Sequence, residues 1–568
     1  MAESAEKTIL GHPRGLVILF LTEMWERFSY YGMRGLLIIY LTQHFLMSDE
    51  SSSVLYGAYG ALVYVMTIIG GSLADRYLGA RKAVTFGAIL LTFGHFGMAF
   101  EGEGSRQLIS HGDNQYEIIL DGRGGDARQQ IVTDLGTSYV SFTETSMDIA
   151  EPEAVGLVPS IDRSEFTMSV ETEEKYLNIL YLSLALIIAG VGFLKANIST
   201  IVGSLYGFGD ARRDSGFTIF YMGINIGAFL ASLSCGYLGI VHGWKYGFGL
   251  AGAGMLLGLV IFLSCQSWLD GKAEPPSVEK LKEKVLFGIN VEWLCYSVGL
   301  GIIAVSMLLV MNADLVGGIL GPVGILMFIW LVSHAFIQLQ GDERSRMLAA
   351  IYFVLAQIPF WALFEQAGSS LNLFTARLVD REIMGWSVPG PVFQSLNAGF
   401  IFLFAPLMAW LWVWLARRKL NPSTPVKFAL GVAMAGLGFL ALVAGMQGSG
   451  AVGLTPVIFI FLIYWIHTMG ELMVSPVGLS AVTKLAPAKI VGMTMGAWFL
   501  YSGLSNYLAG VIARTTGAET IGGQMTNVAA AKAGYVDVYA QVGYIALGIA
   551  LLMLLISPVI NKMMRGAD

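Results

Sequence analysis

The chain has 568 residues, of which 55% are hydrophobic and only 13% are charged, with a formal net charge of -6. A soluble globular protein carries about 25% charged residues, so this composition excludes a soluble fold of such length. Apolar runs of roughly 20 residues, each long enough to cross about 30 Å of hydrocarbon, recur along the whole chain. The sequence therefore predicts an all-α polytopic membrane protein.

The apolar windows predict fourteen membrane-spanning helices, with both termini on the same side. In chain order the windows are 14–46, 53–74, 82–100, 175–205, 214–241, 245–268, 289–312, 315–340, 346–378, 390–416, 424–446, 452–484, 489–513 and 535–562. Lys and Arg gather in the even-numbered connections, for example at Arg76 and Arg81 after the second helix. By the positive-inside rule, both termini are predicted to be cytoplasmic.

Two polar stretches interrupt the series of helices. Residues 101–174 contain sixteen Asp and Glu against four Arg, and on this topology they lie outside the cell. Strand-like segments at Gln115–Leu120 and Ser138–Phe142, with a turn-like DGRGGD at 121–126, predict a small extracytoplasmic β-rich unit. The second stretch, residues 269–288, predicts a cytoplasmic linker after the sixth helix.

The first predicted helix carries four charges, Glu23, Glu26, Arg27 and Arg34, inside apolar sequence. Each costs about 2.5–3.5 kcal/mol at the centre of a bilayer, so the set needs a compensating role. At about 100° per residue, Glu23, Arg27 and Arg34 lie within about 40° of one another, Tyr31 widens this stripe, and Glu26 lies at its edge. A polar face that looks into the helix bundle is predicted, with a purely structural cluster of ion pairs as the alternative.

Other predicted helices also carry isolated polar residues in apolar surroundings. They are Tyr64, Lys195, Asn225, Glu365, Asn397 and Glu471. A cavity with separate acidic and basic ends suits a zwitterion, and carboxylates in excess can carry protons. The sequence has no Walker A motif, no Cys/His cluster and no nucleophile–base arrangement. We therefore expect a protein that is not an enzyme and that binds no cofactor and no metal.

Several motifs occur together, in order, over nearly the whole chain. They are EMWERFSYYG at Glu23–Gly32, the loop segment Gly70–Arg76, FLKAN at Phe193–Asn197, FTIFYMGINIGAF at Phe217–Phe229 and the segment Glu471–Ser480. Together they resemble the proton-dependent oligopeptide transporter (POT) family of the major facilitator superfamily. The second predicted helix has no histidine, unlike the animal members, so the chain resembles the bacterial branch.

The resemblance implies the major facilitator fold, with two six-helix bundles and an inserted helix pair among its fourteen helices. It assigns an N-terminal bundle to 1–268 (which includes 101–174), the linker to 269–288, the inserted pair to 289–340 and a C-terminal bundle to 341–568. It also implies a multi-pass protein of the bacterial inner (cell) membrane that functions as a monomer and binds no nucleic acid.

The same resemblance implies a proton-coupled symporter that imports di- and tripeptides by alternating access between the bundles. The peptide carboxylate would meet the basic residues and its amino group would meet Glu471. Proton coupling is assigned to Glu23, Glu26, Arg27 and Glu365. Substrate binding is assigned to Arg27, Tyr31, Arg34, Tyr64, Lys195, Asn225, Asn397, Glu471 and Trp498.

Two other interpretations remain open from the sequence. The same scaffold could carry another small solute, such as a nitrate-like anion or a drug-like compound. Glu471 discriminates between these cases, because a simple anion has no amino group for a carboxylate to bind. The chain could instead be a structural or receptor-like membrane protein that uses the acidic insert to bind a partner, in which case its interior charges could be neutralised without loss of function.

Overall fold

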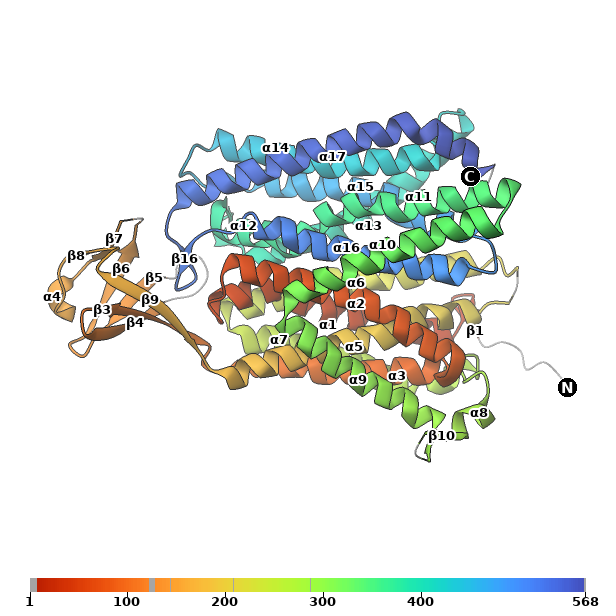
Figure 1. Ribbon diagram of the computed structural model, residues 1–568, viewed down its shortest axis with the longest axis horizontal. Coiled ribbons are helices and arrows are strands. Elements are labelled where there is room, and N and C mark those ends of the chain that lie inside the picture. The colour runs from red at the N-terminus through yellow and green to blue at the C-terminus, as the bar shows by residue number, and fades with distance from the viewer. Residues whose placement is uncertain (1–7, 122–127, 144, 208, 287, 566–568) are drawn as a thin grey trace.

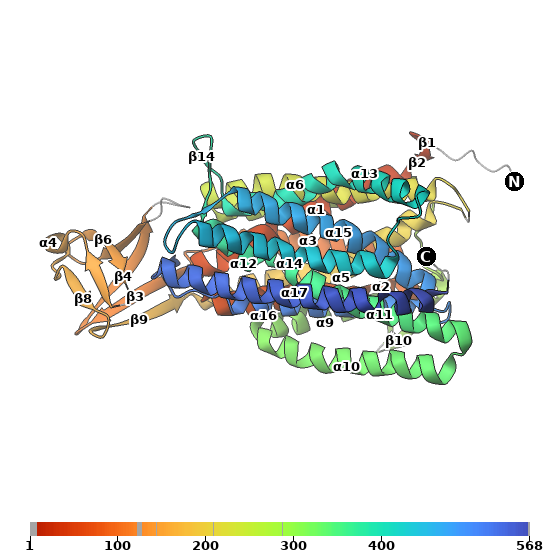
Figure 2. The same ribbon diagram turned by 90° about the horizontal axis from the view of Figure 1, so that it is seen from above.

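The helices lie side by side along one long axis, and the insert stands at one end of them (Figures 1 and 2). The computed structural model describes residues 8–565 apart from 122–127, 144, 208 and 287. Strand β1 (Thr8–Ile9) and the last turn of α17 (Val528–Met564) both lie at the end opposite the insert (Figure 1). We call the end that carries the insert the sheet end and the other the terminal end.

The described residues form fourteen helices of 19 residues or more, which confirms the predicted number. They are α1 (Gly15–Gln43), α2 (Asp49–Leu73), α3 (Ala80–Met98), α5 (Glu174–Ser204), α6 (Arg213–Val241), α7 (Trp244–Ser264), α9 (Val291–Met311), α10 (Ala313–Gln338), α11 (Gly341–Phe364), α13 (Ser395–Arg417), α14 (Thr424–Gly448), α15 (Ile458–Leu485), α16 (Val491–Arg514) and α17. Eleven helical segments of the described chain are long and apolar enough to cross a membrane by length and composition. The other three, α1, α3 and α16, lie alongside them (Figure 1).

The helix predicted at 346–378 is interrupted in the structure. Helix α11 ends at a 3-10 turn, Glu365–Gly368, and α12 (Ser370–Leu378) begins after Ser369, whose φ of -119° and ψ of -102° are not helical. A Cβ on Gly368 would collide with the hydroxyl oxygen of Tyr56, so α2 approaches the chain closely at this turn. Gly368, Ser369 and Ser370, residue types common in turns, coincide with this break in a window that is otherwise predicted as one helix.

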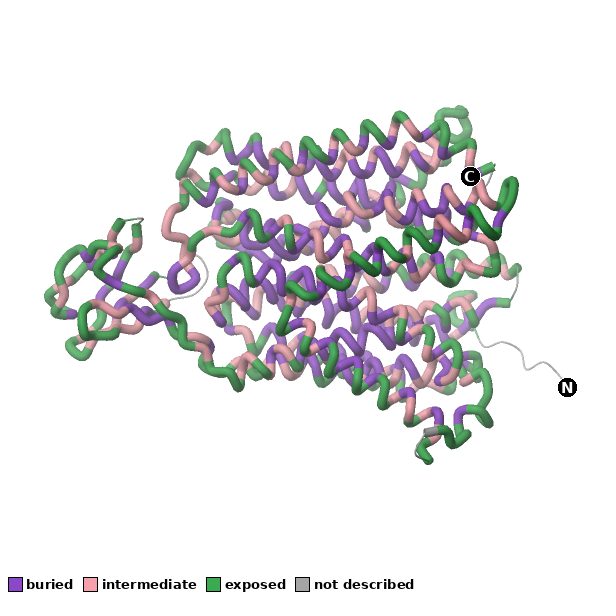
Figure 3. Tube along the Cα trace, viewed as in Figure 1, coloured by how far each residue is buried: buried purple, intermediate pink, exposed green. Residues whose placement is uncertain are grey.

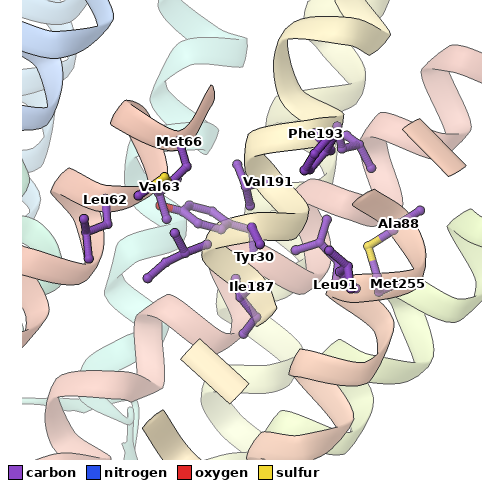
Figure 4. Packing of buried hydrophobic residues seen from close by; sticks show 14 of the residues in the cluster. Tyr30, Leu62, Val63, Met66, Ala88, Leu91, Ile187, Val191, Phe193 and Met255 are labelled. Atoms are coloured by element: carbon purple, nitrogen blue, oxygen red, sulfur yellow. The ribbon is translucent and has the colours of Figure 1, made fainter. Parts of the chain in front are cut away.

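Two large buried apolar clusters hold the helices together. One lies mainly among α1, α2, α3, α5 and α7 and includes Tyr30, Val63, Leu91 and Phe193 (Figure 4). The other lies mainly among α11, α14, α15, α16 and α17. Buried residues line the inward faces of the helices while exposed residues follow their outer faces (Figure 3). We refer to the helices up to α7 as the first half and to those from α11 as the second half.

The insert between α3 and α5 is an antiparallel sheet, as its alternating sequence predicts. Its strands are β3 (Ser105–His111), β4 (Asn114–Asp121), β5 (Arg128–Val132), β6 (Thr137–Phe142), β7 (Ser146–Ile149), β8 (Ser160–Asp162) and β9 (Phe166–Thr172), in the spatial order 8-7-6-5-4-3-9. We call Ser105–Thr172 the sheet unit. It has an apolar core of its own that includes Ile109, Ile118 and Ile131. The turn predicted at 121–126 lies, after Asp121, outside the described residues.

The two halves are in direct contact at the sheet end. Arg377 of α12 donates two hydrogen bonds to the Asp49 carboxylate at the start of α2, at 2.6 and 3.0 Å. Both side chains are buried, with 8% and 2% of their surface exposed. Close to this pair α2 crosses α16, where a Cβ on Gly57 would lie 2.8 Å from the Cα of Gly510. Small residues permit this close approach of two helices.

Arg377→Ala should raise the free energy of the state closed at the sheet end by about 3–5 kcal/mol, because it leaves the Asp49 carboxylate buried without its cation. The measurements are the melting temperature in detergent and the rate of maleimide labelling of a cysteine introduced at the buried Ser53. Arg514→Ala is the matched control, since Arg514 is 51% exposed and lies 4.0 Å from Glu50. If both variants behave alike, the buried pair has no special role.

At the terminal end, the 269–288 segment packs against the first half. It contains a short helix, α8 (Val278–Lys282), and precedes α9. Arg81 donates to both carboxylate oxygens of Glu274, at 2.6 and 2.9 Å. These hydrogen bonds and the charge of Arg81 hold the pKa of the Glu274 carboxyl below its usual value. The pair therefore stays ionised at neutral pH, at a position outside the helix bundle.

Candidate functional site

A cavity of 330 Å³ lies between the two halves, and most of the polar residues predicted from the sequence line it. From the predicted set the lining contains Glu23, Arg27, Tyr31, Arg34, Tyr64, Lys195, Asn225, Glu365, Asn397, Glu471 and Trp498. Its volume is in the range of small-molecule sites. Glu26 is the predicted residue that does not line it. Glu26 is 0% exposed and lies behind the cavity wall, which agrees with its place at the edge of the helical stripe.

The polar stripe of α1 forms one wall of the cavity. The Arg27 Nε donates to Glu23 Oε1 at 2.9 Å and lies 2.5 Å from Glu26 Oε2. One guanidinium nitrogen of Arg27 and one carboxylate oxygen of Glu23 are buried without a hydrogen-bond partner among the described residues. Buried polar atoms are usually hydrogen-bonded, so these two atoms leave hydrogen-bonding capacity unused at this wall.

A second ion pair connects the halves across the cavity. Arg34 of α1 pairs with Glu365, in the turn that interrupts the helix after α11. The Arg34 Nε also donates to the hydroxyl of Tyr56 at 2.7 Å, and its guanidinium lies 6.0 Å from the centre of the Tyr31 ring. The helix break thus places a carboxyl of the second half beside a cation of the first half. An event that separates this pair would loosen one connection between the halves.

Lys195 of α5 supplies the third cation of the cavity. Its Nζ lies 4.1 Å from the centre of the Tyr64 ring in α2. Among the described residues, no carboxylate oxygen lies within 4.0 Å of the Lys195 Nζ. Arg27, Arg34 and Lys195 therefore form a basic region in which the lysine ammonium faces an aromatic ring rather than a carboxylate.

Glu471 of α15 lies in the opposite wall of the cavity. Its Oε2 accepts a hydrogen bond of 2.8 Å from the Asn397 amide of α13, and the same amide donates to Thr468 Oγ1 at 3.1 Å. Asn225 of α6 also lines the cavity, with its own amide bonded to the backbone carbonyl of Tyr221 at 3.0 Å. The carboxyl of Glu471 is thus oriented by an amide and has no cation of the described chain within salt-bridge distance.

Aromatic residues complete the walls, and sequence reasoning missed several of them. Trp498 of α16 is 6% exposed and lines the cavity as predicted. Tyr221 and Tyr464 also line it, and Tyr56 bonds to Arg34 from outside the lining. Helical periodicity could have indicated two of these, because Tyr56 lies eight residues before Tyr64 and Tyr221 lies four residues before Asn225.

A largely apolar crevice continues from the cavity toward the terminal end. It has a volume of 1030 Å³ and lies between α6, α13 and α15. Glu471 and Tyr221 border both spaces, and Arg213 and Thr483 mark the far end of the crevice. The crevice extends from the cavity toward the terminal end, whereas the Asp49–Arg377 pair joins the halves at the sheet end.

Comparisons with known sequences agree with this geometry. The model of the POT family matches residues 81–528. The chain is 34% identical to the uncharacterized transporter YclF of Bacillus subtilis (99% of this chain, 97% of the relative). It is 32% identical to the peptide transporter YePEPT of Yersinia enterocolitica (89% and 88%). It is 29% identical to the dipeptide and tripeptide permease A of Citrobacter koseri (100% and 96%).

Solved structures show the same architecture. A variant of a peptide transporter in complex with alafosfalin has a TM-score of 0.74 and 32% identity, over 99% of this chain and 98% of that chain. A POT family transporter in complex with 5-aminolevulinic acid has a TM-score of 0.73 and 27% identity, over 98% of each chain. With a family model that matches most of its length, the chain belongs to the POT family, whose members are membrane transporters rather than enzymes.

Proposed function

We propose that the protein is a proton-coupled symporter that imports di- and tripeptides by alternating access. The observation that supports this proposal most directly is the cavity, in which Arg27, Arg34 and Lys195 face Glu471 across the interface of the halves. A short peptide is a zwitterion with a carboxylate at one end and an ammonium at the other, which complements this division of charge. Relatives that are named as peptide transporters, and as a dipeptide and tripeptide permease, support the choice of substrate.

The bound peptide would lie with its carboxylate at the basic region and its amino group at Glu471. Arginine suits the carboxylate because its planar guanidinium can form two parallel hydrogen bonds. Asn225 and Asn397 would add hydrogen bonds beside the amino group. Recognition of the two ends leaves the side chains free, so the aromatic walls at Tyr31, Tyr64 and Trp498 would tolerate many of them.

Proton coupling would act through competition for the cations. A proton on Glu365 neutralises the partner of Arg34, which is then free to bind the peptide carboxylate and no longer ties the halves together. Glu23 and Glu26 hold Arg27 in the same manner. One protonation would thus prepare the binding site and release a contact between the halves, which is the sequence of events that symport requires.

The proposed topology places the terminal end in the cytoplasm and the sheet unit outside a bacterial inner membrane, in a protein that works as a monomer. In a background without native cysteines, Asp113→Cys in the exposed β3–β4 turn should react with a membrane-impermeant maleimide in intact cells. Glu279→Cys in α8 should react only after the cells are opened. The reverse pattern would invert the orientation.

The experiment that tests the function is uptake of labelled dialanine into proteoliposomes under an imposed pH gradient, acid outside. Accumulation above the external concentration, abolished by a protonophore, is expected. Uptake that only equilibrates the peptide would remove the proton from the mechanism. No uptake of dialanine or trialanine by protein that retains its melting temperature would remove peptides as substrates.

A second candidate is proton-coupled transport of another small solute by the same cavity. A POT family neighbour was solved with 5-aminolevulinic acid and another with alafosfalin, and these compounds differ from ordinary dipeptides. Competition by such compounds, or by nitrate, against labelled dialanine decides between the candidates. A compound that is transported when dialanine is not would replace the peptide as the substrate.

A further inference from the structure

The sheet unit carries two buried glutamines on one face, close to the helix bundle. In the antiparallel register Gln107 pairs with Ile118, and Gln129 pairs with Leu120. Ile118 and Leu120 lie two residues apart on β4. Side chains two residues apart lie on the same face of a sheet, so both glutamines share the face of Ile118. They are only 6% and 8% exposed. Such buried amides need hydrogen-bond partners.

The Gln107 amide nitrogen donates to the Ser169 carbonyl within the sheet at 3.1 Å, but the other partners lie in the second half of the protein. The hairpin Thr520–Met525, formed by β16 (Thr520–Ile521) and β17 (Gln524–Met525), connects α16 to α17. The Gln129 amide donates to the carbonyl of Ile521, and the backbone N–H of Gly522 donates to Gln107 Oε1 at 3.3 Å. These contacts join positions that are 392 and 415 residues apart in the sequence.

The tip of this hairpin is enclosed on two sides. A Cβ on Gly522 would lie 3.0 Å from the Gln129 amide nitrogen, and one on Gly523 would lie 3.3 Å from the Thr42 carbonyl at the end of α1. Both glycines have positive φ, +52° and +78°, so the tight turn and the lack of space both require glycine. The hairpin therefore lies between the sheet unit and the first half.

The sheet unit is in turn fixed to the first half. The Ser105 N–H donates to the His44 carbonyl at 2.8 Å, directly after α1. The ring of His44 lies 2.8 Å from the Glu101 carbonyl, and Glu101 Oε2 accepts from the backbone N–H of Lys245 at the start of α7 at 2.8 Å. The unit cannot follow the hairpin when the two halves separate at this end without breaking these bonds.

We propose that the sheet unit is a docking surface for the Thr520–Met525 hairpin and that this contact stabilises the state closed at the sheet end. Alternating access requires the halves to part at that end, so the hairpin must leave Gln107 and Gln129 in each cycle. The contact then sets the population of the open state, and with it the apparent affinity for external substrate. The proposal rests on the alternating access proposed above and on no particular substrate.

The test compares two double variants in a background with Ser53→Cys at the closed crossing of α2 and α16. Gln107→Ala with Gln129→Ala removes the docking bonds and also the bond from Gln107 to Ser169 within the sheet. The control pair, Gln115→Ala with Gln130→Ala, removes an exposed and a partly exposed amide of the same sheet. The first pair should raise the rate of labelling by an impermeant maleimide about fivefold to a hundredfold, the shift that two lost hydrogen bonds give in a two-state equilibrium. The control pair should leave the rate unchanged.

A second measurement keeps the proposal testable if the first variant fails to fold. A reducible bifunctional thiol reagent should cross-link Gln129→Cys to Thr520→Cys. The cross-link should stop transport, and reduction of the cross-link should restore it. Gln130→Cys with Thr520→Cys should not cross-link. Equal labelling of the two alanine pairs, or full transport by the cross-linked protein, would overturn the proposal. Labelling needs no substrate, so failure of dialanine uptake in the unmodified protein would count only against the proposed substrate.

Discussion

Glu471→Ala is expected to weaken binding of dialanine by about 30-fold to several thousandfold. Truncating one partner of a buried charge pair costs about 2–5 kcal/mol, and each 1.4 kcal/mol is about tenfold in affinity. Glu471 lines the cavity, 9% exposed, with Asn397 as its partner in the described structure. A carboxyl oriented by an amide but not neutralised by a protein cation is available for the ammonium of a peptide.

Acetylation of the peptide amino group separates this role from a structural one. In the unmodified protein, N-acetyl-dialanine should bind far more weakly than dialanine. In the Glu471→Ala variant, the two peptides should bind about equally well. The four dissociation constants form a double-mutant cycle, and an interaction energy near zero would disprove contact between Glu471 and the amino group. Asn397→Ala is the matched control, since it keeps the carboxyl and removes only its orienting hydrogen bond, so a smaller loss is expected.

Much of the site could be predicted because charges inside apolar helices are costly. Glu23, Arg27 and Arg34 share one face of an ideal helix, and that face lines the cavity. Lys195 and Glu471 were identifiable as single charges in apolar windows, and both reach the same space. The local sequence was sufficient for these residues, because a charge that is flanked by apolar residues on both sides must lie within a membrane helix.

Contacts between distant segments could not be predicted in this way. The turn at Glu365 lies inside a window predicted as one helix, and the Tyr56 hydroxyl of another helix lies against Gly368 of this turn. Gln129 looks like an ordinary polar residue of a strand, yet its partner is Ile521, 392 positions away. Neither strand alternation nor helical periodicity contains information on such pairs, because both describe only neighbours along the chain.

Glu365→Gln is expected to abolish proton-driven accumulation while it preserves exchange of peptide across the membrane. Glutamine resembles a permanently protonated carboxyl, so Arg34 would be free for substrate at every pH and the gradient could no longer be sensed. A gradient of one pH unit is worth about 1.4 kcal/mol per proton, enough for about tenfold accumulation with one proton per peptide. The variant should show no accumulation above the external concentration.

Counterflow is the measurement that makes this result specific. Vesicles loaded with unlabelled dialanine should still take up labelled dialanine through the Glu365→Gln variant, since exchange needs the substrate-bound protein to reorient but needs no net proton movement. Glu274→Gln is the matched control, because Glu274 also pairs with an arginine but lies outside the helix bundle and far from the cavity lining. It should retain tenfold accumulation under the same gradient. If Glu365→Gln accumulates dialanine as well as Glu274→Gln does, the Arg34–Glu365 pair is only a structural connection between the halves. In that case Glu23 and Glu26, which lie beside Arg27, become the remaining candidates for the proton site.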